Sequence, residues 1–192
     1  MNKSMIEGIR SYITVGAEPL LLNLLADQHF RQSYLQQMKQ LVCDRSLSLG
    51  CLVFSITVMK LLLTVSQDVR ECWTNQEEGE NIINCVFDII PSCHIEFSKG
   101  LQFSNEGKEN ICLYDYTLIN IGALTISCKE LEAIEKKLLV TILQPEIWSA
   151  FLAIDLWTII ARFACAEFRF DQMVYLMQSF DQLCKSDMIK DM

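Results

Sequence analysis

Residues 146–168, EIWSAFLAIDLWTIIARFACAEF, give the strongest indication of the fold. Pro145 precedes them at the expected first helical position, where a missing backbone N–H costs nothing. Apolar side chains recur with a helical period and cover a very wide face: Ile147, Phe151, Ile154, Leu156, Trp157, Ile160, Ala161 and Ala164. A helix this apolar has to be packed on most of its circumference by other helices. The stretch therefore predicts an all-helical protein.

Three charged residues interrupt this apolar surface: Asp155, Arg162 and Glu167. Asp155 and Arg162 are about two helical turns apart, so they point to the same side. Charges on such a helix need partners or a groove that stays hydrated. We favour a structural role, in which they bridge neighbouring helices and Arg162→Ala weakens the fold; a groove for a partner peptide is the alternative. Trp157 is expected in the core more than at an interface, although tryptophan is enriched in binding hot spots.

The same helix carries a family resemblance. The run LAIDLWTIIARFACAE (152–167), preceded by CKELEAIEKKLLVTIL (128–143), resembles an internal portion of the FIRRM family, the fidgetin-like-interacting regulators of recombination and mitosis. The resemblance is best over residues 128–184, and the first half of the chain agrees only in general character. Family members are several-fold longer, so a fragment, an alternative product and a divergent short relative all fit. The matching positions are Leu152, Ala153, Asp155, Trp157, Ala161, Arg162, Phe163, Ala166 and Glu167.

The resemblance implies a function as well as a fold. It implies a nuclear, non-enzymatic scaffold, for which a cytoplasmic pool is also compatible, with HEAT/armadillo-like stacked helices. Its partner would be a fidgetin-like AAA ATPase, which supplies the chemistry and acts on recombinase filaments in homologous recombination and DNA crosslink repair. Asp155, Trp157, Arg162 and Glu167 are then family-motif positions, either structural or lining a partner groove. The alternative is a generic helical-repeat adaptor with an unrelated partner, whose match in this helix reflects convergent packing.

The pattern along residues 1–192 predicts one all-α domain, a degenerate HEAT/armadillo-like α-solenoid of about seven or eight helices. We expect an irregular loop at 92–108, with a strand pair in HIEF and LQF as the alternative, and strand is a rival to helix for ICLYDYTLI (111–119). Ser127 and Glu130 have capping-box spacing. The expected helices are 2–14, 19–42 with a possible break near 28–30, 47–66, 80–90, 108–127, 129–143, 145–168 and 169–184. The last is expected to bury Phe170, Val174, Leu176, Met177, Phe180 and Leu183.

Composition argues against several functional classes. The net charge is −8, from 24 acidic and 16 basic residues, which disfavours direct specific nucleic-acid binding because that needs clustered Lys and Arg. Nine cysteines occur without a C-x-x-C pair, so we expect reduced core thiols and no metal site. There is no P-loop, G-x-G-x-x-G, G-x-S-x-G or H-E-x-x-H motif, and Cys93 with His29 is a remote candidate pair. We therefore expect no enzyme activity, cofactor or small-molecule substrate.

One stretch has the length of a membrane span, SLSLGCLVFSITVMKLLLTVS (46–66). Lys60 lies within its apolar body, and a charge in lipid is costly. A buried helix of the array is therefore favoured over a span. The first fifteen residues mix charged and polar side chains, so no secretory signal is expected.

Overall fold

The computed structural model describes residues 18–41, 45–74, 81–104, 110–129 and 131–163, together with 170, 173–178, 181–182 and 185. Residues 18–24 are also helical, and the helix predicted at 2–14 lies outside the described residues. The prediction of an all-α protein is confirmed, since in these described ranges only two three-residue strands accompany the helices. In chain order the elements are α2 Gln28–Leu41, α3 Ser48–Leu62, α4 Gln67–Thr74, α5 Ile82–Ile89, the 3-10 helix η1 Ile90–Cys93, α6 His94–Ser98, β1 Gln102–Ser104, β2 Asn110–Cys112, α7 Leu113–Ile126, α8 Glu132–Ile142 and α9 Ile147–Phe163.

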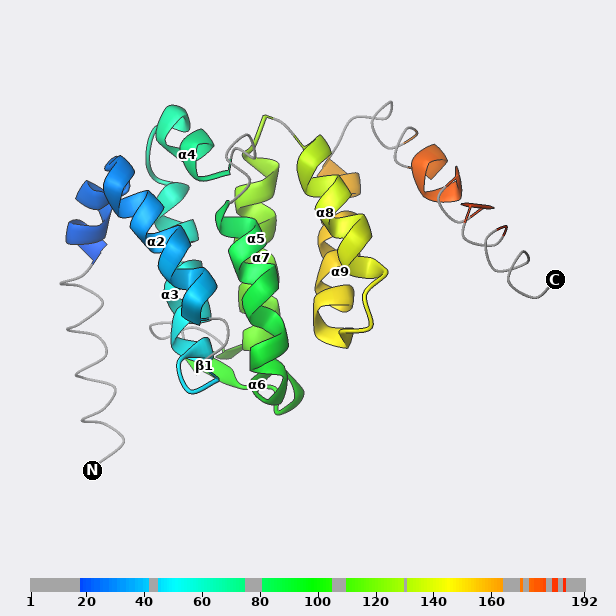
Figure 1. Cartoon of the computed structure of the whole chain (residues 1–192), viewed down its shortest axis with the longest axis horizontal. Coiled ribbons are helices and arrows are strands. Elements are labelled where there is room, and N and C mark those ends of the chain that lie inside the picture. The colour runs from blue at the N-terminus through cyan, green and yellow to red at the C-terminus, as the bar shows by residue number, and fades with distance from the viewer. Residues whose placement is uncertain are drawn as a thin grey trace.

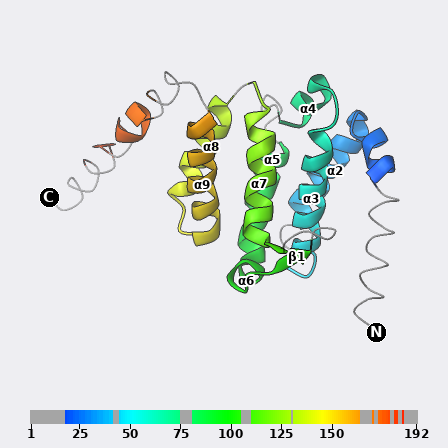
Figure 2. The same ribbon diagram turned by 180° about the vertical axis from the view of Figure 1, so that it is seen from behind.

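Helices α2, α3, α5, α7, α8 and α9 form two layers. In Figure 1, α2, α5 and α8 lie in front, and in Figure 2, seen from behind, α3, α7 and α9 face the viewer. In the rear layer α7 packs against both α3 and α9, and α8 packs across the layers onto α9. An ion pair of 3.2 Å between Lys137 and Asp88 joins α8 to α5 in the front layer. The chain thus makes three antiparallel helical pairs side by side, α2–α3, α5–α7 and α8–α9.

Helix α3 is apolar around its whole circumference and occupies the interior. It contacts α2, α5, α7 and η1, which explains why Leu52, Ile56 and Leu62 are fully buried. This is the buried helix expected within residues 46–66. Among the described residues no helix is long and apolar enough to span a membrane.

The irregular loop predicted at 92–108 is wrong for residues 92–104. Pro91 begins a 3-10 turn, where its missing N–H is tolerated, and helical backbone continues through α6. Gly100 then ends the helix with φ of 58°, a conformation that glycine adopts at little cost. HIEF is helical, whereas LQF contributes to β1, which pairs antiparallel with β2 in the register Gln102↔Cys112.

Helix boundaries also differ from the sequence predictions. The long helix predicted from residue 19 is interrupted at 25–27, just before the possible break named near 28–30. At this point the side chain of Asp27 accepts a hydrogen bond of 2.8 Å from the backbone N–H of Phe30. The helix predicted over 108–127 begins only at Leu113, because residues 110–112 form β2. The Ser127 capping box is wrong as well: Ser127 ends α7, and its hydroxyl donates to the Leu124 carbonyl at 2.6 Å.

The last predicted helix is helical at the described positions but not buried. Phe170, Val174, Leu176 and Met177 are all exposed, and Met173 beside them is 59% exposed. Figures 1 and 2 both show these residues standing clear of α8 and α9. Phe180 and Leu183 lie outside the described residues. The prediction of burial is therefore wrong, because an amphipathic stripe indicates a helix without supplying a surface for it to pack on.

Candidate protein-interaction surface

Helix α9 carries the residues that the sequence singled out, and its inner face is fixed by packing. Leu152, Ala153, Leu156 and Ile160 are buried between α7 and α8. Trp157 is also buried, with 7% of its surface exposed, so it contributes to the core and offers little to a partner. Its position follows from the helical period, since residues 153, 156, 157 and 160 share one face.

The first turn of α9 is held by the side chain before it. The two carboxylate oxygens of Glu146 accept hydrogen bonds from the backbone N–H groups of Trp148, at 3.2 Å, and Ser149, at 2.6 Å. These N–H groups have no partner within the helix, and a negative charge there complements the helix dipole. The helix accordingly begins at Ile147. Pro145 lies ahead of this cap and not at the first helical position, so that part of the sequence prediction is wrong.

Asp155 joins α9 to α7. The phenol of Tyr114, in the first turn of α7, donates a hydrogen bond of 2.6 Å to Asp155 Oδ2. Burial, and then the neighbouring Asp155 carboxylate, raise the pKa of Tyr114 above its ordinary value, so the phenol stays protonated and remains a donor. Asp155 is itself exposed to solvent. The contact therefore fixes the orientation of a carboxylate that a partner can still reach.

The other charged positions of the predicted motif are placed differently. Arg162 lies exposed in the last turn of α9, where a positive charge complements the helix dipole. Within the described ranges its guanidinium forms no hydrogen bond or ion pair, with Asp155 or with any other group. Glu167 lies outside the described residues. The structure thus brings together Asp155 and Tyr114, a partner that the sequence did not indicate.

An aromatic cluster lies beside Asp155 and was missed by the sequence analysis. Trp148 stacks on Phe97 with ring centroids 5.8 Å apart and lies 6.1 Å from Tyr114 and 6.4 Å from Phe151. The Trp148 indole N–H donates to the hydroxyl of Ser98 at 3.3 Å. These rings come from α6, α7 and α9, which are far apart in the sequence. Only the contacts of the fold bring them together, so no local pattern could have found them.

The rings of the aromatic cluster extend from the core to the surface, and their solvent exposure increases along the way. Phe97 is buried, Trp148 and Tyr114 are half-buried, and Phe151 is 49% exposed. Ile147, Phe151 and Ile154 recur at i, i+4 and i+7, so they share the outward face of α9. We use the term α9 surface for Tyr114, Trp148, Phe151 and Asp155. It combines an exposed ring, two half-buried rings packed against their neighbours and one carboxylate hydrogen-bonded to Tyr114.

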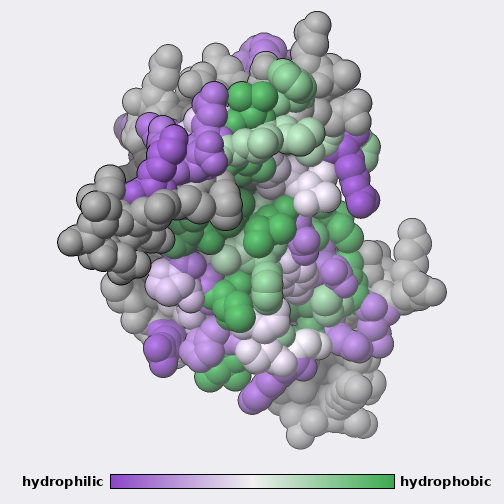
Figure 3. All heavy atoms as spheres, turned by 90° about the vertical axis from the view of Figure 1, so that its right-hand side faces the viewer, coloured by the Kyte–Doolittle hydropathy of each residue, from purple (hydrophilic) through white to green (hydrophobic). Residues whose placement is uncertain are grey.

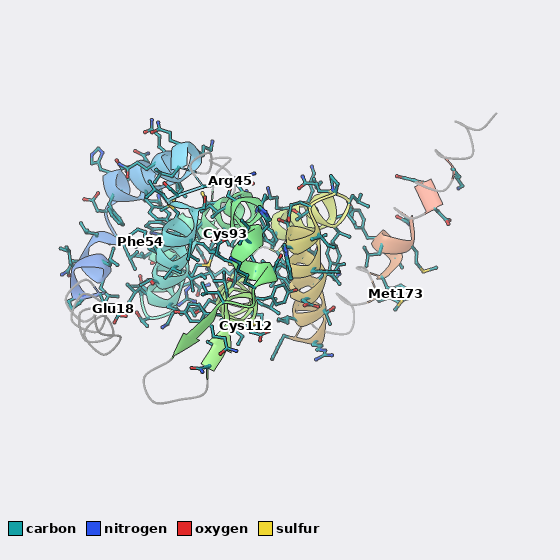
Figure 4. The ribbon with its side chains drawn as sticks, turned by 90° about the horizontal axis from the view of Figure 1, so that it is seen from below. Glu18, Arg45, Phe54, Cys93, Cys112 and Met173 are labelled. Carbon is teal, nitrogen blue, oxygen red and sulfur yellow. The ribbon has the colours of Figure 1, made fainter. Side chains whose placement is uncertain are left out.

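The described residues offer little for covalent or metal chemistry. No group of three or more His, Cys, Asp or Glu side chains in the described ranges could hold a metal ion. Cys93, labelled within the bundle in Figure 4, is fully buried, and burial raises the pKa of its thiol to about 12. His29 lies exposed on α2. A thiol kept protonated in the core suits packing and not nucleophilic attack.

Comparisons with known proteins identify a family and a relative of this chain. A family profile described as "Domain of unknown function (DUF4487)" matches residues 1–189. The chain belongs to this family. It is also similar to the zebrafish (Danio rerio) "FIGNL1-interacting regulator of recombination and mitosis", with 20% identity over 186 residues. That match covers 90% of this chain but 20% of the zebrafish protein, so the chain spans about a fifth of its relative's length.

These matches confirm the resemblance to the FIRRM family and extend it. The sequence analysis found it best over residues 128–184, whereas the alignment with the zebrafish protein runs through nearly the whole chain, the first half included. No solved structure matches the chain.

Proposed function

We propose that this chain is a non-enzymatic helical scaffold of the HEAT/armadillo-like α-solenoid type that works in the regulation of recombination by binding a fidgetin-like AAA ATPase. The printed name of the zebrafish relative describes an interaction with FIGNL1 and a role in recombination and mitosis. The three side-by-side helical pairs support the repeat architecture, since each pair buries apolar faces on its neighbour. Recombination takes place on nuclear DNA, so the proposal includes a nuclear location.

The observation that carries the partner proposal is the α9 surface. Its exposed Phe151 ring packs edge-on against the half-buried Trp148, with ring centroids 6.4 Å apart, and Trp148 in turn packs against Tyr114. Binding hot spots combine such rigid aromatic anchors with a rim of polar groups. Asp155 supplies the polar group, already oriented by Tyr114 at 2.6 Å. The side chains of the α9 surface therefore lose little conformational freedom when a partner binds.

The net charge of the chain indicates which surfaces it can attract. The chain carries a net charge of −8, so a protein surface with basic residues is attracted to it and duplex DNA is repelled. A scaffold of this kind contributes shape and position, and the ATPase supplies the chemistry.

Isothermal titration calorimetry of the purified full chain with a purified fidgetin-like AAA ATPase tests the proposal. Phe151→Ser should weaken binding by about tenfold, the loss expected for one aromatic anchor. Leu20→Ser is the matched control: Leu20 is 61% exposed at the opposite end of the stack, and its substitution should leave the affinity unchanged. Absence of binding by the wild-type chain, or equal losses in the two variants, would refute the proposal.

A further inference from the structure

The α8–α9 end of the stack exposes apolar side chains that no described residue covers. Val140 and Leu143 of α8 are each half exposed or more, and Ile147 and Ile154 of α9 are exposed beside them; we call these four residues the end face. Figure 3 looks onto this end of the molecule and shows apolar side chains gathered over its middle. An exposed apolar surface of this kind usually marks a contact with another element.

A second uncovered apolar surface lies a short distance along the same chain. Phe170, Met173 and Met177 are helical and exposed, and their spacing of three and four residues places them on one side. The sequence keeps that spacing through Phe180 and Cys184. The positions between them hold Asp171, Gln172, Gln178, Ser179, Asp181 and Gln182, together with the apolar Val174, Tyr175, Leu176 and Leu183. Figure 4 shows Met173 well away from α9. The chain therefore has an exposed apolar side on its C-terminal helical segment and an exposed apolar end face, and the two do not contact each other in this structure.

We propose that residues 170–185 dock on the end face of the same chain as a fourth front-layer helix, in equilibrium with the extended arrangement. The stack alternates between its two layers, and α9 lies in the rear layer, so the next helix belongs in front, beside α8. Six residues, 164–169, separate α9 from Phe170, which is an ordinary length for a connection between antiparallel helices. Fully extended they reach about 20 Å.

Docking of residues 170–185 from the same chain is favoured over docking of a second chain, because residues 164–169 connect the segment directly to α9. A six-residue connection keeps the segment at an effective concentration in the millimolar range, about a thousandfold above a micromolar solution of free chains. Docking also supplies what each surface lacks, since Phe170, Met173 and Met177 cover Val140, Leu143 and Ile154 and leave the polar residues of the segment in water.

Photo-crosslinking of the purified full chain tests this inference without the ATPase, so it stands or falls separately from the proposed function. Benzoylphenylalanine replaces Ile154 on the end face, and in a matched control it replaces Leu20 at the opposite end; both positions are exposed. Trypsin cleaves after Arg169 and Lys185 and releases residues 170–185 as one peptide. We expect that peptide to be joined to the probe at 154, in the band of monomer mass, and not to the probe at 20.

Substitutions in the segment sharpen the result. Met173→Asp with Met177→Asp should lower the yield at position 154 by about tenfold, because charges are then placed against apolar side chains. Gln178→Asp, which places one added negative charge at an exposed polar position beside Met177, should leave the yield unchanged. Crosslinks confined to the dimer band would assign the end face to a second copy, and no crosslink, or a yield insensitive to the double substitution, would also overturn the proposal.

Discussion

The hydrogen bond between Tyr114 and Asp155 decides how the α9 surface is held, and a double-mutant cycle measures it. Tyr114→Phe removes the donor and keeps the ring, and Asp155→Ala removes the acceptor. A hydrogen bond to a charged acceptor contributes about 1.5–3 kcal/mol when it is shielded from water. Tyr114 is half-buried but Asp155 is exposed, so solvent screening reduces the expected coupling energy to about 1 kcal/mol.

Urea unfolding of the full chain, followed by circular dichroism at about pH 7, gives the four free energies of the cycle. The phenol is protonated there, because burial and Asp155 raise the pKa of Tyr114. The matched control combines Tyr114→Phe with Arg162→Ala, and its coupling energy should be close to zero. Arg162 is exposed and contacts no charged group in the described part of the chain, so Arg162→Ala alone should cost less than about 0.5 kcal/mol.

Two results would contradict this reasoning. A coupling energy below about 0.3 kcal/mol for Tyr114 and Asp155 would mean that the contact does not hold the carboxylate in solution. A loss above about 1 kcal/mol in Arg162→Ala would instead support the structural bridge that the sequence analysis favoured for Asp155 and Arg162.

Substitutions at three other positions test the fold. Trp73→Phe should destabilise the chain by about 1–3 kcal/mol in urea unfolding, since the buried indole N–H donates to the Leu25 carbonyl at 2.9 Å; an unchanged midpoint would contradict this. Glu146→Ala should cost about 1 kcal/mol by removing the acceptor at the start of α9, whereas Glu146→Gln, which keeps an acceptor, should cost less. Burial raises the pKa of Cys93 from 9.0 to about 12, so its stabilising contribution is complete below about pH 9 and is lost as pH rises toward 12; Cys93→Ala should show a shallower fall in stability over that range, and parallel curves would argue against it.

The helices with wide apolar faces could be predicted because periodicity alone determines them. The all-apolar α3 lies in the interior, as its pattern requires, and Trp157 of α9 is buried. The expectation that α9 is packed on most of its circumference is wrong, because Ile147, Phe151 and Ile154 on its outward face are exposed. The segment 92–104 could not be assigned in the same way. Pro91 and Gly100 read as loop formers, yet here they begin a 3-10 turn and end a short helix. Their meaning depends on backbone conformations that the fold selects.

The α9 surface could be predicted only in part from the sequence, for a different reason. That Asp155 needs a partner followed from its charge on an apolar helix, but Tyr114 is 41 positions away and sits on α7. The aromatic cluster around Trp148 likewise unites three helices. Such contacts depend on which helices become neighbours, and a single sequence holds no record of that pairing. The sequence analysis expected Asp155 and Arg162 to bridge neighbouring helices; the structure shows such a contact for Asp155, whereas Arg162 is exposed at the end of α9.

Asp155 and Arg162 differ in how they are held, and this difference affects the specificity expected at the α9 surface. Both side chains are exposed on one helix, yet only Asp155 is held in a defined orientation, by Tyr114. Phe151 and Asp155 are four residues apart on α9, so they share one side of the helix and present a partner with one apolar and one acidic contact about one turn apart. Arg162, on its long flexible stem, must be ordered by the partner at an entropic cost. Recognition is therefore expected to depend on the pair Phe151 and Asp155, and Arg162 adds to long-range attraction more than to the geometry of the complex.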